Sequence, residues 1–112
     1  MPNDEISFQI LTILSDHPQI SQRELARELG ISLGKANYCL NALIEKGILK
    51  VNNFRNNKNK IAYVYILTPK GIEEKAKVAA RFLKRKMAEF DALQMEIQEL
   101  RKQVDAGLEK LS

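Results

Sequence analysis

The sequence predicts a mainly α-helical protein with one small β-hairpin and a long C-terminal helix. Apolar residues recur at helical spacing up to about Lys46, β-branched and aromatic residues then dominate two short runs, and no helix breaker follows from Pro69 to about Ala106. The chain has 112 residues, 45% hydrophobic and 29% charged, which indicates one small folded domain with an appended helix.

The first predicted helix covers residues 6–14, where the apolar residues fall at largely helical spacing. Asn3 or Asp4 can cap its start, because both side chains accept hydrogen bonds from free main-chain N–H groups. His17-Pro18 ends the segment, since a residue that precedes proline avoids helical backbone angles.

A capping box predicts the start of a second helix. Ser21 can accept a hydrogen bond from the main-chain N–H of Glu24, and the Glu24 side chain can reach back. Leu25 and Leu29 then face inward, as their helical spacing requires. Gly30 ends this helix, because the tight turn needs a residue that tolerates positive φ.

A third helix is predicted from its N-cap, Ser32, to about Lys46, with Gly47 as its C-terminal stop. The second and third helices cross where their residues are small, at Ala26 and Ala36. Two helices joined by a short turn, preceded by an amphipathic helix and followed by a charged hairpin, predict a winged helix-turn-helix.

The hairpin is predicted from residues 48–51 and 61–67, because β-branched and aromatic residues dominate both arms. The link between them, residues 52–60, is rich in asparagine, which tolerates turn conformations. Its basic residues are Arg55, Lys58 and Lys60.

Thr68-Pro69 predicts the start of the last helix, since a capping hydroxyl precedes proline at the first helical position. A helix from there to about Ala106 would be ~57 Å long, nearly twice the width of a small domain. Its far half cannot pack on its own core. We therefore expect a winged helix-turn-helix domain in residues 1–68 and a helix for dimerisation in residues 69–112.

Apolar residues of this last helix alternate in steps of three and four, which is typical of a coiled coil. Lys86 and Gly107 break the pattern, with Met87 and Leu108 as neighbouring substitutes. The part from Ile72 to Leu83 is expected to pack on its own domain. The expected dimerisation residues are Leu83, Met87, Phe90, Leu93, Ile97, Leu100 and Val104.

Positive charge is concentrated in the middle third of the chain. Residues 32–70 carry seven basic and one acidic group, a net charge of +6. Residues 1–31 carry a net charge of −3 and residues 71–112 a net charge of +1. A localised basic segment of this kind is typical of a face that binds a polyanion.

Other function classes find little support. One histidine and one cysteine, Cys39, give no metal cluster, and the five glycines form no phosphate-binding loop, so we expect no enzyme, metal or cofactor. Apolar runs are shorter than the roughly 20 residues that span a bilayer, and no signal peptide is visible, so a cytoplasmic location is expected. Cys39 is either a small buried hydrophobe or a redox switch.

If Ala36, Leu40 and Leu43 face the core, the opposite face of the third helix presents polar side chains that suit the major groove of duplex DNA. Helix N-termini offer N–H groups to phosphate, and cations of the hairpin can enter the minor groove or clamp the backbone. The expected DNA-binding residues are Ser21, Gln22, Arg23, Ser32, Gly34, Lys35, Asn37, Tyr38, Asn41, Arg55, Lys58 and Lys60.

The expected partners are double-stranded DNA and a second copy of the chain, with no membrane and no assigned small-molecule effector. One alternative is a protein-interaction module, in which the winged helix is a scaffold and the coiled coil recruits a partner. Another is binding of RNA or single strands, which usually requires aromatic stacking platforms. Here only Tyr38 and Phe54 suit that role.

Four stretches, residues 21–26, 37–47, 53–56 and 67–72, resemble the small MarR-like regulators associated with exopolysaccharide gene clusters in bacteria. The resemblance covers about residues 8–100, and the second and third stretches are specific to that group. It implies a dimeric, winged-helix, DNA-binding transcriptional regulator tied to exopolysaccharide production.

The chain departs from the broader MarR pattern in the hairpin. Those proteins usually carry Asp-x-Arg before the Leu-Thr pair, whereas the matching stretch here is Asn59-Lys60-Ile61. An arginine buttressed by an acid is therefore not expected, and Arg55 or Lys58 would have to serve in its place.

Overall fold

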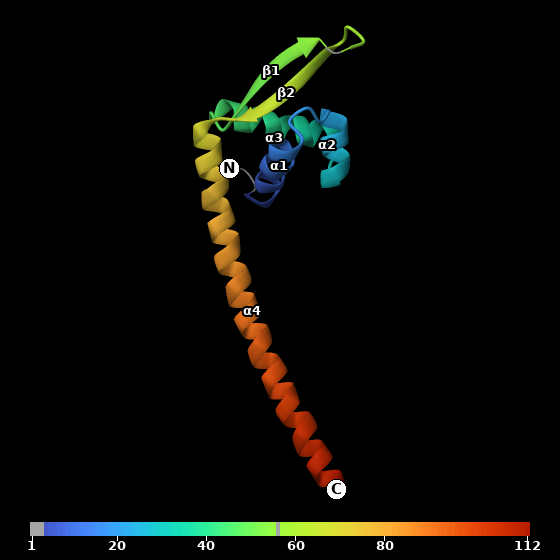
Figure 1. Ribbon diagram of the computed structural model, residues 1–112, viewed down its shortest axis with the longest axis vertical. Coiled ribbons are helices and arrows are strands. Elements are labelled where there is room, and N and C mark those ends of the chain that lie inside the picture. The colour runs from blue at the N-terminus through green and yellow to red at the C-terminus, as the bar shows by residue number, and fades with distance from the viewer. Residues whose placement is uncertain (1–3, 56) are drawn as a thin grey trace. The chain divides into compact units, whose positions relative to one another are not determined.

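The computed structural model describes residues 4–55 and 57–112 (Figure 1). The predicted fold class is confirmed: helices dominate, and the two strands form one antiparallel hairpin. The elements in chain order are α1 (Asp4–Asp16), α2 (Gln22–Leu29), α3 (Leu33–Glu45), β1 (Leu49–Arg55), β2 (Ile61–Leu67) and α4 (Pro69–Leu111). The chain divides into two compact units, of which the first ends at Ala79 and the second comprises Ala80–Ser112.

The capping residues predicted for α2 and α3 are confirmed. The Ser21 hydroxyl accepts from the Glu24 N–H at 3.1 Å, and the Ser32 hydroxyl accepts from the Lys35 N–H at 3.1 Å. Gly30 ends α2 with a φ of +67°, a left-handed conformation that favours glycine. These caps satisfy main-chain groups that a helix end otherwise leaves without partners.

Of the two caps predicted for the first helix, Asp4 is wrong, because α1 begins at Asp4 and this residue lies within the helix. The other, Asn3, lies outside the described residues. The predicted stop is confirmed, because α1 ends at Asp16, directly before His17-Pro18.

The core of the first unit lies where α1, α2, α3 and the base of the hairpin meet. Figure 1 shows the three helices grouped on one side of β1 and β2. Full burial of one such aliphatic side chain stabilises the fold by roughly 1.5–3 kcal/mol. The largest fully buried apolar residues around this core are Ile10, Leu11, Leu14, Leu25, Leu40, Leu43, Ile48 and Leu49.

The first strand is longer than predicted. β1 continues to Arg55, and its residues pair in register with β2, from Leu49 opposite Leu67 to Arg55 opposite Ile61. Residues 52–55 therefore belong to the hydrogen-bonded strand pair and not to the link between the strands. Asn56, which is part of that link, lies outside the described residues. Asparagine has low strand propensity, but hydrogen bonding to a seven-residue partner strand overrides that local preference.

The Tyr65 side chain ties the hairpin to α2. Tyr65 is buried, and its hydroxyl accepts a hydrogen bond from the Gln22 side-chain amide at 2.8 Å. The Tyr65 N–H donates to the Pro18 carbonyl at 3.0 Å. These two bonds connect β2 to the segment that leads into α2.

The start of α4 is built on close contact with Ile48. The Thr68 hydroxyl accepts from the Gly71 N–H at 3.0 Å, which confirms the predicted cap, and the Thr68 N–H donates to the Ile48 carbonyl at 3.0 Å. A Cβ on Gly71 would lie only 2.0 Å from that carbonyl oxygen. Glycine is required here because the helix backbone and the Ile48 backbone pack directly together.

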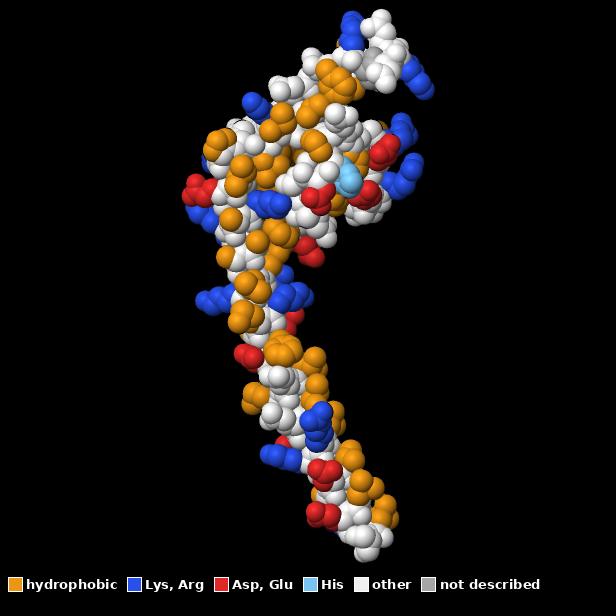
Figure 2. Space-filling view, viewed as in Figure 1, with side chains coloured by type: hydrophobic (Ala, Val, Ile, Leu, Met, Phe, Trp, Pro, Cys, Tyr) orange, Lys and Arg blue, Asp and Glu red, His pale blue; other side chains and the backbone are white. Residues whose placement is uncertain are grey.

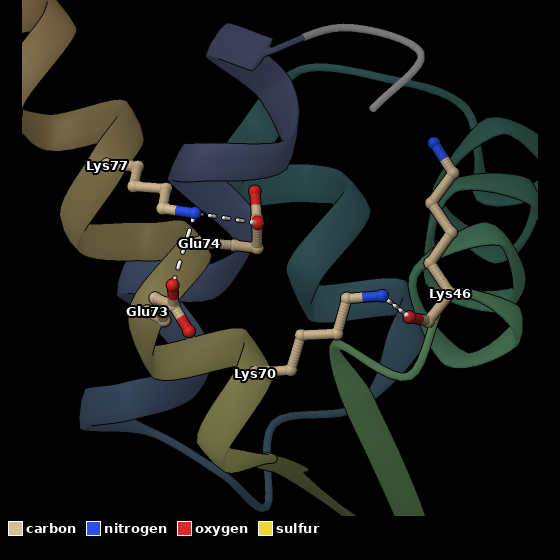
Figure 3. A network of polar contacts seen from close by, with 5 residues as sticks. All are labelled: Lys46, Lys70, Glu73, Glu74 and Lys77. Atoms are coloured by element: carbon tan, nitrogen blue, oxygen red, sulfur yellow. Dashed lines mark hydrogen bonds and ion pairs between the residues drawn. The ribbon is translucent and has the colours of Figure 1, made fainter.

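Polar contacts add to this junction (Figure 3). The Lys70 ammonium donates to the Lys46 carbonyl at the end of α3, at 2.9 Å. Further along α4, Lys77 pairs with Glu73 at 3.1 Å and lies 3.9 Å from Glu74. The Lys77–Glu73 side chains are mostly exposed, so this pair contributes at most about 1 kcal/mol.

The expectation that Ile72 to Leu83 pack on their own domain is wrong. Ile72 is 61% exposed and Leu83 is 60% exposed, whereas Gly71 and Val78 are buried. The apolar side chains form two stripes around α4, and the close approach at Gly71 turns the Gly71–Val78 stripe toward the core.

α4 also continues beyond its predicted end near Ala106, as far as Leu111. Gly107 lowers helix propensity by roughly 1 kcal/mol relative to alanine, which is too little to end a helix of this length. Among the described residues, no helix is both long and apolar enough to cross a membrane.

Replacement of Gly71 by alanine is expected to lower the free energy of unfolding of the first unit by about 1–3 kcal/mol or more, because the new methyl group would clash with the Ile48 backbone. Gly107→Ala is the matched control. Nothing lies within 4 Å of its added Cβ, so alanine should stabilise the helix by about 0.5–1 kcal/mol. Chemical denaturation checks both, and equal effects of the two variants would contradict the packing described.

Removal of the Tyr65 hydroxyl in Tyr65→Phe is expected to cost about 0.5–1.5 kcal/mol of stability, because the Gln22 amide loses its partner. Tyr63→Phe serves as the control, since Tyr63 is 49% exposed and its loss of a hydroxyl should change stability by less than about 0.5 kcal/mol. Thermal unfolding of both variants measures the difference.

Candidate nucleic-acid interface

One face of α3 is polar and exposed because the opposite face is fully used by the core. Ala36, Leu40 and Leu43 are 0–1% exposed, as predicted from their spacing, and Cys39 is buried beside them. The helical period then directs the remaining side chains outward. The predicted DNA-binding residues on this exposed face are Lys35, Asn37, Tyr38 and Asn41.

Two further predicted residues lie at the start of α3. The Ser32 hydroxyl is engaged as the N-cap of the helix, so its side chain has a structural role. Gly34 is exposed, and an added Cβ would meet nothing within 4 Å. The packing of the domain therefore does not require glycine at this position, which leaves the helix backbone open to close approach by a ligand.

The predicted residues at the start of α2 differ in their surroundings. The Ser21 hydroxyl caps α2, and the Gln22 amide is held by the Tyr65 hydroxyl. Arg23 is exposed beside them. Ser21 and Gln22 thus have structural partners, and Arg23 offers an exposed cation near the helix N-terminus.

The tip of the hairpin carries the predicted cations, seen in blue at that end of the hairpin in Figure 2. The Arg55 guanidinium donates to the Asn59 carbonyl at 3.1 Å, and Asn59 has a φ of +60° that asparagine tolerates better than most residues. A main-chain carbonyl thus holds Arg55, in place of the acidic side chain that buttresses an arginine in the broader MarR pattern. Lys58 and Lys60 are exposed on the same tip.

A cleft of about 620 Å³ lies between the start of α2, α3 and the hairpin. It brings together three predicted residues, Ser21, Gln22 and Asn37, with side chains of β2. Lys35, Tyr38 and Asn41 do not line it and lie on the exposed face of α3. The start of α2, α3 and the hairpin therefore meet at this cleft.

The sequence analysis missed Ile61 and Tyr63, two lining residues of β2. Ile61 is 57% exposed and Tyr63 is 49% exposed, and both alternate in step with the buried Tyr65, so they share its face of the hairpin. This alternation was the available signal. This face of the hairpin lines the cleft with residues of α2 and α3, away from the charged tip.

The charge of these residues suits binding to a polyanion. Within residues 4–55 and 57–112, no group of three or more His, Cys, Asp or Glu side chains is placed to hold a metal ion. Residues 32–70, which supply most of the interface, carry a net charge of +6. An exposed helix face beside a cationic hairpin matches the way helix-turn-helix proteins read duplex DNA.

Comparison with known proteins supports this interpretation. Residues 3–50 match a family model described as winged helix-turn-helix DNA-binding. No curated protein sequence matches the chain closely enough to count as a relative.

Solved structures of MarR-type regulators share the fold. Staphylococcus aureus MarR in complex with salicylate and kanamycin is 25% identical, with a TM-score of 0.58 over 86% of this chain and 67% of that chain. The PcaV transcriptional regulator from Streptomyces coelicolor is 16% identical, with a TM-score of 0.61 over 90% of this chain and 74% of that chain. A MepR variant from S. aureus is 17% identical, with a TM-score of 0.65 over 96% of this chain and 79% of that chain. The chain therefore carries a DNA-binding winged helix-turn-helix and has the fold of MarR-like transcription regulators.

Proposed function

We propose that this protein is a homodimeric transcriptional regulator that recognises a specific site in double-stranded DNA. The observation that carries the proposal is the exposed polar face of α3, which lies beside a cationic hairpin in the most basic part of the chain. α3 enters the major groove, and the hairpin acts as a wing on the flanking backbone or minor groove.

The side chains of α3 supply base recognition in this proposal. Asn37 or Asn41 pairs bidentately with adenine, and Lys35 reaches guanine or a phosphate. Tyr38, which is 65% exposed, packs on a thymine methyl group or donates to a phosphate. Each good base contact contributes about 1–3 kcal/mol of discrimination against the wrong base.

Contacts to the phosphate backbone position the domain and carry no sequence information. The N-termini of α2 and α3, capped by Ser21 and Ser32, present main-chain N–H groups to phosphate. Gln22 lines the cleft beside them, and Gly34 allows close approach of the backbone. The cations proposed to contact the backbone are Arg23, Arg55, Lys58 and Lys60.

Dimerisation through α4 is proposed because the second unit exposes a row of large apolar side chains, which Figure 2 shows in orange along α4. Such a row is costly in water and is typical of an interaction surface. Two-fold symmetry then implies a pseudo-palindromic site with half-sites about one or two helical turns apart. The side chains of this surface are Leu83, Met87, Phe90, Leu93, Ile97, Leu100 and Val104.

We propose genes of exopolysaccharide production as the targets. The support is the resemblance of residues 37–47 and 53–56 to regulators associated with such gene clusters. Genomic footprinting of the bound protein tests this directly. Footprints near polysaccharide biosynthesis genes are expected, and footprints confined to other genes would overturn the assignment of targets but not DNA binding.

Asn37→Ala and Lys35→Ala are expected to reduce discrimination between the specific site and random duplex by about 1–3 kcal/mol each, because they remove base contacts. Fluorescence anisotropy with both duplexes measures the ratio. Asn52→Ala, an exposed asparagine of β1, and Lys102→Ala, an exposed lysine of the second unit, are matched controls that should leave the ratio unchanged. If the α3 variants behave like these controls, the exposed face of α3 is not the surface that recognises bases.

Arg55→Ala is expected to weaken binding to the specific site and to random duplex by similar factors, because it removes a phosphate contact. If a dimer neutralises about 6–8 phosphates, log affinity should fall with log salt at a slope of about −5 to −7. Arg55→Ala should make this slope shallower, whereas Arg55→Lys should preserve it. Absence of salt-dependent duplex binding at micromolar protein would instead favour a protein-interaction module.

A further inference from the structure

We infer that two copies of this chain pair along α4 in parallel and in register, as a two-stranded coiled coil that begins at Ile72. This inference rests on the homodimer proposed above and specifies its partner surface, its direction and its register. It follows from three features of α4: an apolar stripe that its own domain leaves exposed, the charges that flank this stripe, and a single lysine within it.

The first feature is the division of α4 into two apolar stripes. Gly71 and Val78, seven residues apart, are buried against the first unit. Ile72 and Leu83 lie on another side of the helix and are 61% and 60% exposed, with Ala79 half-buried between them. Folding of the first unit therefore leaves a second stripe that needs a different partner.

This second stripe keeps one heptad register from Ile72 to Leu111. Steps of three and four residues place its members alternately at positions d and a, the two positions that face the partner in a coiled coil. Position a holds Ala76, Leu83, Phe90, Ile97, Val104 and Leu111, and position d holds Ile72, Ala79, Lys86, Leu93, Leu100 and Gly107. The large apolar members on either side of the boundary between the two units are exposed.

The charges beside the stripe favour a parallel pair. In a parallel, in-register coil, position g of one helix faces position e of the next heptad in the partner. Glu96 then faces Arg101 of the second copy, once on each side of the two-fold axis. Phe82 faces Met87 of the second copy, an apolar contact. No like charges meet at these flanking positions.

An antiparallel pair that covers the whole stripe brings like charges together at the flanking positions. Antiparallel helices bring position g against position g. With Ile72 placed opposite Leu111, Glu89 faces Glu96 of the second copy. This repulsive contact occurs twice. A shorter antiparallel overlap, with Ile97 opposite Leu100, avoids this repulsion and brings Glu89 against Lys110 of the second copy, but it leaves the exposed Leu83 and Ile72 without apolar contacts.

Lys86 sets the register. It is the one charged residue among the a and d positions, and on its own helix it pairs with Glu89 at 3.1 Å. Parallel pairing in register confines both lysines to one layer of the coil, whereas any shift or reversal places each lysine against an apolar side chain of the partner. A polar residue at a core position specifies register in this way, at some cost in stability.

A disulfide tests the direction. Gly107→Cys puts a thiol at position d, and in the parallel coil the two thiols face each other within disulfide reach, with Cα atoms about 4.4–6.8 Å apart. In the shorter antiparallel overlap residue 107 lies opposite residue 90, so the two thiols would be about 25 Å apart. Rapid cross-linking of the full-length variant under mild oxidation supports the inference.

Matched controls isolate the position of the thiol. Lys102→Cys places a thiol on the outer side of the coil and should not cross-link, and the unaltered chain, with its buried Cys39, gives the background. If the Gly107→Cys variant sediments as a dimer and binds duplex but fails to cross-link, the parallel coil is overturned and the proposed function stands. A monomer in sedimentation overturns both the dimer and this inference.

Charge reversal tests the contact between Glu96 and Arg101. Glu96→Arg alone, or Arg101→Glu alone, should raise the dissociation constant of the homodimer about tenfold, because two attractive pairs become repulsive. An equimolar mixture of the two variants should form heterodimers of nearly wild-type affinity. Glu99→Arg, on the outer side of the coil, is the control for charge alone. Equal effects of the variants at positions 96 and 99 would overturn the assigned contact.

Discussion

Ile48 holds the first unit together, because the end of α3, the base of the hairpin and the start of α4 all contact this one residue. Its N–H donates to the Leu43 carbonyl at the end of α3 at 3.0 Å, its carbonyl accepts from Thr68, and its side chain is 2% exposed. Gly71 then packs directly on its backbone. The end of α3, the base of the hairpin and the first turn of α4 are therefore placed by contacts that tolerate little displacement.

The proposed DNA-reading face depends on this arrangement. α3 commits Ala36, Leu40 and Leu43 to the core, so the period of the helix leaves Lys35 and Asn37 outside. The Tyr65 bonds to Gln22 and Pro18 tie the hairpin to the start of α2, which packs on α3. The core thus orients the exposed face of α3 without using Lys35, Asn37, Tyr38 or Asn41.

The contact at Gly71 has a consequence for α4 as well. It turns the stripe of Gly71 and Val78 toward the first unit and leaves Ile72 and Leu83 uncovered. Such a helix can stabilise its own domain through the buried stripe and bind a second chain through the exposed stripe. Folding and dimerisation would then depend on separate side chains, so substitutions in the second stripe should spare the fold of the first unit.

The sequence by itself determined the type and order of the elements, the caps at Ser21, Ser32 and Thr68, and the outward face of α3. These features depend on local rules, namely caps, turn residues and the period of a helix whose apolar residues form one stripe. The tertiary structure decided which of the two stripes of α4 is buried, how far β1 extends, and that Tyr63 and Ile61 line the cleft. Local pattern does not settle these points, because two apolar stripes on one helix are equally good candidates until a close contact between distant backbones, here Gly71 with Ile48, selects one of them.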